Sequence, residues 1–147
     1  MIIVRTPFRV SFAGGGTDLS YFYKKYGGVV LSTSIKKYSY LSMHSGFHDK
    51  GYLIKYSKTE DELKLENIKH PIIREVFRMY GIDGVDFSSA ADIPAGTGLG
   101  SSSAFTCGII NLCQSFKGIK STQKEIAKIA CDVEINRLKE QIGKQDQ

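Results

Sequence analysis

One segment near the middle of the chain, Ile93–Phe105, combines three glycines and three serines in the sequence IPAGTGLGSSSAF. An extended, half-apolar run (84–91) precedes it, and a long apolar run (106–116) follows it. This order predicts a strand, a loop and a helix in succession. Because ordering so many small residues costs backbone entropy, the segment is either a flexible turn or a loop whose bare backbone contacts a ligand.

A ligand-binding loop of this composition has a definite chemistry. Glycine adopts positive φ and lets a ligand approach the backbone, and the first N–H groups of a following helix attract an anion. Serine hydroxyls add hydrogen bonds or a magnesium ligand. Gly96–Ser103 is therefore either a triphosphate cradle or a small-residue connector with a serine cap. It lacks the Lys-Ser/Thr pair of a Walker loop, and its glycines do not follow the GxGxxG spacing.

The remaining patterns of strand and helix do not form a regular βαβ repeat. We expect strands at 2–12, 28–34, 37–45, 51–57 and 85–91, and helices at 19–26, 71–80, 101–116 and from 121 or 122 to 138. Pro7 predicts an edge position or a bulge, and Thr17 and Asp18 are the expected N-cap residues of the first helix. Residues 45–51 predict a turn, and 59–69 predict irregular surface. This order favours an α+β fold, a mixed sheet with helices on one side.

The composition fits one globular domain. The chain has 147 residues, 41% of them apolar, and a net charge of +5. This charge suits an anionic ligand, but a solvated surface explains most of the lysines better. No dense basic run with interleaved aromatic residues indicates a nucleic-acid partner. The pattern at the N-terminus leads us to expect no secretory leader, and no apolar stretch is long enough to span a membrane, so we expect no membrane partner. The cysteines predict buried, reduced thiols in a cytoplasmic protein, and the histidines lack zinc-ligand spacing; these residues are Cys107, Cys113, Cys131, His44, His48 and His70.

Three segments resemble motifs of the GHMP kinases, in the order in which that family carries them. PAGTGLGSSSA at 94–104 resembles the family signature, TPFRVSFAGGGTDL at 6–19 resembles the N-terminal motif of its sugar-handling members, and IGKQDQ at 142–147 resembles the segment that carries the catalytic aspartate. The resemblance implies a ribosomal protein S5 domain 2-like fold for 1–147, with the C-terminal GHMP domain absent. It also implies an ATP- and Mg²⁺-dependent kinase that acts on a small sugar phosphate.

The same resemblance assigns a role to individual residues. Asp146 matches the catalytic base, and Arg9 matches an arginine at the reacting centre. Glu134, with Asp132 as a nearby competitor, matches the magnesium-binding glutamate, which would share the ion with the Ser102 hydroxyl. Asp18 matches the sugar-binding aspartate. The residues that would bind ATP phosphates are Gly96, Gly98, Gly100, Ser101, Ser102 and Ser103, and those beside the sugar are Gly14, Gly15 and Gly16.

The substrate implied by the resemblance is D-glycero-D-manno-heptose 7-phosphate, phosphorylated at its anomeric (C1) hydroxyl. Galactokinases typically carry Gly-Glu-His where this chain has Gly14–Gly16, which argues against galactose. Another sugar 1-kinase, such as a fucokinase-like enzyme, and a non-catalytic anion- or RNA-binding module of the same fold are the alternatives. The acidic residues argue against the module. Arg5, Lys36 and Lys37 are each possible partners of the distal phosphate, and the sequence does not choose among them.

Overall fold

A five-stranded sheet forms the base of the molecule. In the computed structural model, which describes residues 1–46 and 51–147, the strand order is β1-β2-β5-β3-β4. Adjacent strands are antiparallel except β3 and β5, which are parallel, so the sheet is mixed, as predicted. The strands are β1 (Ile2–Ala13), β2 (Leu31–Ser45), β3 (Tyr52–Lys55), β4 (Thr59–Glu62) and β5 (Val85–Ala91). The turn predicted at 45–51 falls mostly on residues 47–50. These four residues, His48 among them, lie outside the described residues.

β1 lies at an edge of the sheet, where Pro7, which has no N–H group, is tolerated. Pro7 is opposite Tyr38 and Arg9 is opposite Ser34, so β2 contains extra residues opposite Phe8. The strand order confirms the edge position, one of the two alternatives predicted from Pro7, and the irregular pairing beside Pro7 agrees with the other, a bulge. A bulge re-aims the side chains beside it; here Phe8 enters the core, and Arg9 reaches the loop that precedes the central helix.

Two predictions about the strands are wrong. The separate strands predicted at 28–34 and 37–45 form the single strand β2, because the bulge accommodates the intervening residues within the strand. The segment 59–69 is not irregular, since it contains β4 and the 3₁₀ turn η1 (Leu65–Asn67). Two residues of this charged segment are buried. Ile68 is fully buried in the core, and the buried Glu60 accepts hydrogen bonds from the Tyr56 hydroxyl and the Lys69 N–H.

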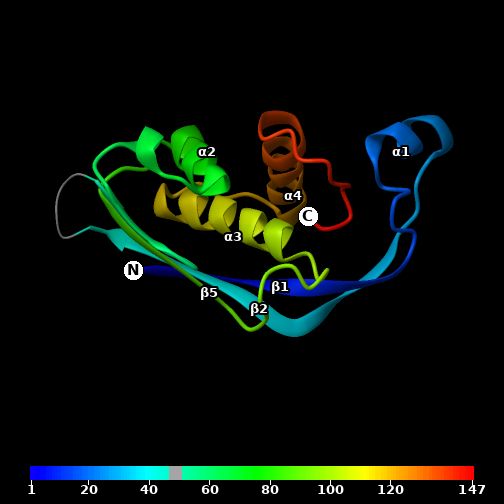
Figure 1. Cartoon of the computed structure of the whole chain (residues 1–147), viewed down its shortest axis with the longest axis horizontal. Helices are drawn as coiled ribbons and strands as arrows, with labels where there is room; N and C mark the ends of the chain where they lie inside the picture. The colour runs from blue at the N-terminus through cyan, green and yellow to red at the C-terminus, as the bar shows by residue number, and fades with distance from the viewer. Residues whose placement is uncertain (47–50) are drawn as a thin grey trace.

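Three helices cover one face of the sheet, as predicted, and Figure 1 shows α3 lying next to the sheet, with α2 and α4 above it in the view. α3 contributes Ile109, Ile110 and Leu112 to the core, where they are fully buried. The predicted end of the last helix, near 138, is confirmed, although the final turn is a π-helical segment, η2. The bounds are α1 (Ser20–Tyr26), α2 (Pro71–Tyr80), α3 (Ser101–Phe116), α4 (Gln123–Cys131) and η2 (Asp132–Arg137).

α1 lies apart from the other helices, at one end of the sheet (Figure 1). The prediction that Thr17 and Asp18 cap it is wrong, because Leu19 is the N-cap residue and makes no side-chain cap bond. Thr17 Oγ1 instead donates to the carbonyl oxygens of Gly14, at 2.7 Å, and Val29, at 3.0 Å. Asp18 accepts from the Gly16 N–H, so both side chains shape the glycine-rich loop before α1 rather than the helix terminus.

The three cysteines are free thiols, as predicted, but only Cys113 is fully buried. Cys107 and Cys131 are half-buried, and burial raises the pKa of Cys107 to about 12. Thiols with such raised pKa values are unreactive at neutral pH. Separately, none of the helices within residues 1–46 and 51–147 has the length and apolar character that crossing a membrane requires.

The N-terminus of α4 resolves the choice between Ser121 and Thr122. Thr122 forms a capping box with Glu125: its hydroxyl accepts from the Glu125 N–H, and the Glu125 carboxylate accepts from the Thr122 N–H. Thr122→Ala is expected to lower the free energy of unfolding by about 1 kcal/mol. Ser121→Ala is the matched control, expected to change it by less than about 0.5 kcal/mol. Urea unfolding of both variants checks this, and equal effects would contradict the assignment of the cap.

Candidate active site

The glycine–serine loop, residues 96–103, leads into the N-terminus of α3, which no side chain caps. Gly96, Gly98 and Gly100 have φ of +82°, +72° and +71°, values that side-chain-bearing residues rarely adopt. Gly100 is the N-cap residue of α3, and no side chain caps the helix there. The first N–H groups of α3 therefore keep their hydrogen-bonding capacity for an anion.

Arg9 joins this loop to the C-terminal segment 142–147. Its Nη1 donates to the Gly98 carbonyl oxygen at 2.8 Å, and its Nε donates to Asp146 Oδ1 at 2.7 Å. Nη2 contacts the same Asp146 oxygen, and the Arg9 N–H donates to the Leu99 carbonyl oxygen at 3.3 Å. Residues 137 positions apart in the sequence thus meet in one ion pair. The two residues predicted to be catalytic lie together, beside the predicted phosphate loop.

Glu134 lies on η2, directly behind the first turn of α3, and is only 1% exposed. Its carboxylate accepts hydrogen bonds from Ser102 Oγ at 3.0 Å, Ser103 Oγ at 2.9 Å and Thr106 Oγ1 at 3.0 Å. The Gln147 amide donates to it as well. The competitor Asp132 is turned away, toward Arg137 Nε and Asn136 Nδ2. Between the two acidic residues, Glu134 is therefore the one that faces the loop.

The donor set of Glu134 and Ser102 fits magnesium. Octahedral magnesium with bonds of 2.0–2.1 Å holds neighbouring oxygens about 2.9 Å apart, and the hydroxyl oxygen of Ser102 lies 3.0 Å from Glu134 Oε1. Across residues 1–46 and 51–147, no group of three or more His, Cys, Asp or Glu side chains gathers as a metal site. An ion at this pair would complete its coordination with phosphate oxygens and water, as magnesium usually does.

Asp18 connects the glycine-rich loop before α1 to the same C-terminal segment. It is 9% exposed and accepts hydrogen bonds from the Gly16 N–H at 3.0 Å and the Gln145 N–H at 3.2 Å. Ser11 Oγ donates to the Gln145 side chain at 3.0 Å, which adds a second tie from β1. Gly14 packs so closely on the Val29 backbone that a Cβ would clash, whereas Gly15 and Gly16 face open space.

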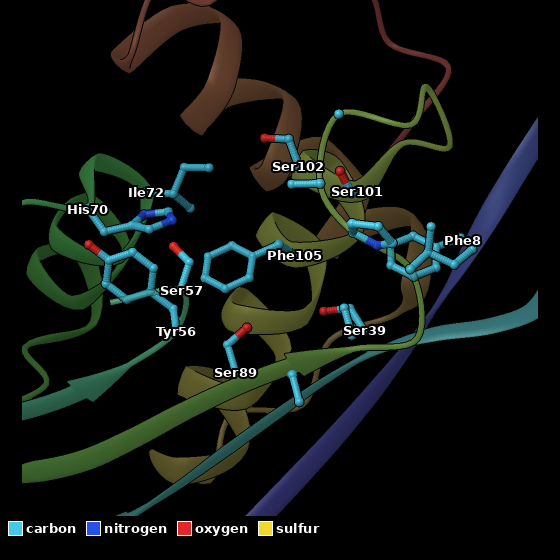
Figure 2. Close-up of a pocket in the computed structure, with 16 residues that line it drawn as sticks. Phe8, Ser39, Tyr56, Ser57, His70, Ile72, Ser89, Ser101, Ser102 and Phe105 are labelled. Carbon is cyan, nitrogen blue, oxygen red and sulfur yellow. The ribbon is translucent and has the colours of Figure 1, made fainter. Parts of the chain in front are cut away.

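A cavity of about 560 Å³ opens beside the glycine–serine loop. Figure 2 shows Ser101 and Ser102 on one side, the rings of Tyr56 and His70 on the other, and the ring of Phe105 between them. The His70 ring centroid lies 5.0 Å from that of Tyr56 and 5.1 Å from that of Phe105. Burial lowers the pKa of His70, which is thus neutral at pH 7, and its buried Nδ1 has no hydrogen-bond partner among the described residues.

The aromatic lining of this cavity was not predictable from sequence patterns. Tyr56, His70 and Phe105 come from three separate segments. The strand or helix pattern around each residue predicts a structural role and gives no sign of a binding role. Only the position of His70, immediately before Pro71 at the start of α2, marks it as a helix-boundary residue.

The profile described as the GHMP kinases N terminal domain matches residues 67–147, more than half of the chain. A D-glycero-alpha-D-manno-heptose 7-phosphate kinase of Campylobacter jejuni is 30% identical over 160 residues, covering 99% of this chain and 47% of that protein. The crystal structure of a D-glycero-D-manno-heptose 1-phosphate kinase from Bacteroides thetaiotaomicron superposes with a TM-score of 0.90 at 25% identity, over 100% of this chain and 52% of the other.

This chain belongs to the GHMP kinase family. A Streptococcus pneumoniae phosphomevalonate kinase, solved with phosphomevalonate and AMPPNP, shares the fold, with a TM-score of 0.75 at 18% identity over 93% of this chain and 43% of the other. The predicted α+β fold of the family's N-terminal domain is thus confirmed. The chain spans about half the length of the relatives that it matches.

The close approach of Gly143 to Asp18 gives a prediction for the site. A Cβ added at Gly143 would overlap the Asp18 carboxylate, whereas one added at Gly15 would meet nothing. Gly143→Ala is expected to lower the free energy of unfolding by about 1–3 kcal/mol through overpacking, and Gly15→Ala by less than about 0.5 kcal/mol. Urea unfolding measures both. If Gly143→Ala were as stable as the wild type, the contact between the 142–147 segment and Asp18 would be wrong.

Proposed function

We propose that this chain forms the ATP-binding part of a kinase that phosphorylates the anomeric hydroxyl of D-glycero-D-manno-heptose 7-phosphate. The observation that carries the proposal is the bridge made by Arg9 between the glycine–serine loop and Asp146. This bridge holds the loop at the N-terminus of α3, where the phosphates would bind, next to the Asp146 carboxylate, which would act as the base. A structural connector would not require that arrangement.

ATP would bind with its phosphates at the N-terminus of α3 and its nucleoside in the neighbouring cavity. The three positive-φ glycines let the backbone approach the phosphates closely, and its N–H groups would supply the phosphate contacts. The rings of Tyr56, His70 and Phe105 supply apolar area for a base, and the neutral His70 ring supplies an unused nitrogen for a hydrogen bond. Magnesium would sit at Glu134 and Ser102 and neutralise charge on the phosphate oxygens.

Arg9 and Asp146 suit a direct transfer of the γ-phosphoryl group from ATP to the sugar hydroxyl. Both contacts from Arg9 go to Asp146 Oδ1, and no described residue donates to Oδ2. Oδ2 would accept the proton of the sugar hydroxyl as its oxygen forms the bond to the γ-phosphorus and the bond to ADP breaks. The Arg9 guanidinium would stabilise negative charge on the transferred group. Asp18, with Gly15 and Gly16, would receive the sugar hydroxyls.

The relatives support a heptose phosphate, but their names differ on the position of the phosphate. The Campylobacter protein is named for the 7-phosphate and the Bacteroides structure for the 1-phosphate. We choose the 7-phosphate because the relative that bears that name is the more similar in sequence. A cytoplasmic location, where ATP is supplied and the three thiols stay reduced, and a need for the second GHMP domain to close the site are parts of the same proposal.

ADP release with Mg-ATP tests the proposal, measured on the full-length protein that contains this chain. The panel comprises heptose 7-phosphate, heptose 1-phosphate, unphosphorylated heptose and fucose. We expect turnover with heptose 7-phosphate and a fall in kcat of about 10²- to 10⁴-fold in Asp146→Asn. Asp61→Asn, at an exposed residue of β4, is the matched control and should match the wild type.

Two results would contradict the proposal. Turnover with another sugar alone would keep the kinase but replace the substrate. No turnover with any sugar, by a folded protein that binds Mg-ATP, would reject the sugar kinase.

A further inference from the structure

Two cavities lie on the side of the site where Asp18 meets the C-terminal segment. The first, of about 410 Å³, is lined by Asp18, Gln145 and the glycine-rich loop. The second, of about 660 Å³, lies between α1 and α4. Tyr23 and Lys144 line both, so the two cavities adjoin at these residues. In Figure 1 the segment after η2 lies between α4 and α1.

The second cavity is strongly basic. Four lysines line it, from α1, from α4 and from the C-terminal segment: Lys24, Lys124, Lys128 and Lys144. None of them forms an ion pair in the part of the chain that the structure describes. Asp132 is the one carboxylate in the lining, and it already accepts from Arg137 and Asn136. Four like charges around one hollow create a local positive potential that favours an anion there.

Lys144 fixes where this charge lies relative to the reacting centre. Its Nζ sits 4.6 Å from the centroid of the Tyr23 ring, at the junction of the cavities. The next residue, Gln145, donates its N–H to Asp18, and the one after it is Asp146. Two residues span at most about 7 Å. Lys144 also lines the same cavity as Asp18, so a phosphate on a sugar held by Asp18 would be within reach of the Lys144 ammonium group.

We propose that Lys24, Lys124, Lys128 and Lys144 form the subsite for the distal phosphate of the sugar phosphate. The subsite rests on the proposed function, whose substrate it makes specific: the acceptor must carry a phosphate at the end opposite its reacting hydroxyl. A substrate phosphorylated beside the reacting hydroxyl would leave the four charges unused. These four lysines differ from Arg5, Lys36 and Lys37, the three possible partners of the distal phosphate among which the sequence did not choose.

Those three residues are placed less well for this role. Lys36 and Lys37 are exposed on β2 and line neither cavity. Arg5 lies in a different hollow, which Asp146 also lines, but it is the one cation in the lining of that hollow, whereas four lysines line the second cavity. Arg5 is therefore the competing site that the experiment must exclude.

The test is titration calorimetry of heptose 7-phosphate and of unphosphorylated heptose, without nucleotide, into the full-length protein and its variants. Lys144→Gln and Lys128→Gln are each expected to weaken binding of the phosphorylated sugar about 10- to 100-fold, because each removes a charge-assisted hydrogen bond. Binding of unphosphorylated heptose should stay unchanged. Arg5→Gln, and Lys64→Gln at an exposed lysine outside both cavities, are expected to bind both sugars as the wild type does.

The outcomes separate the subsite from the proposed function. Equal binding of the phosphorylated sugar by the wild type and both lysine variants would overturn the subsite, even if the protein is an active kinase. Loss of binding in Arg5→Gln instead would overturn it in favour of the other hollow. The expected loss in the lysine variants supports the subsite even if ADP release fails, because calorimetry needs no turnover.

Discussion

The ion pair between Arg9 and Asp146 is the contact on which the arrangement of the site depends. Arg9 follows the irregular pairing between β1 and β2, and its guanidinium reaches two elements at once. One contact fixes the Gly98 carbonyl of the glycine–serine loop, and the other fixes the aspartate. Arginine suits this position because its planar fork makes several hydrogen bonds with one orientation, so the glycine–serine loop and the proposed base keep a fixed relation.

A buried carboxylate supports the same site from the other side. A charge without partners would be costly to remove from water, but Glu134 is surrounded by three hydroxyls and one amide. It ties the first turn of α3 to the π-helical segment η2, and π-helical turns occur often at functional sites. Magnesium at this position would replace some of these hydrogen bonds with ionic ligation. The hydroxyls thus serve both the folded state and the proposed ion.

Much of the fold could be predicted from local patterns. The bounds of α2, α3 and β5 follow from Pro71, Gly81 and the apolar periodicity, and the fold class follows from the order of elements. β4 and the burial of Glu60 could not be predicted, because the partners of this carboxylate, the Tyr56 hydroxyl and the Lys69 N–H, meet it only in the folded chain. The motifs supplied the candidate residues 9, 18, 134 and 146. Their meeting, the aromatic cavity and the lysine cluster depend on segments that only the folded chain brings together.

The rate of phosphoryl transfer in Arg9→Lys tests the central claim most directly. Lysine keeps the positive charge but cannot contact Gly98 and Asp146 together in the arginine geometry. The account predicts that kcat falls about 100-fold or more, while a non-hydrolysable Mg-ATP analogue binds within about threefold of the wild-type affinity, because the N–H groups of α3 remain in place. An Arg9→Lys protein with wild-type kcat would show that the bridge does not organise the active site.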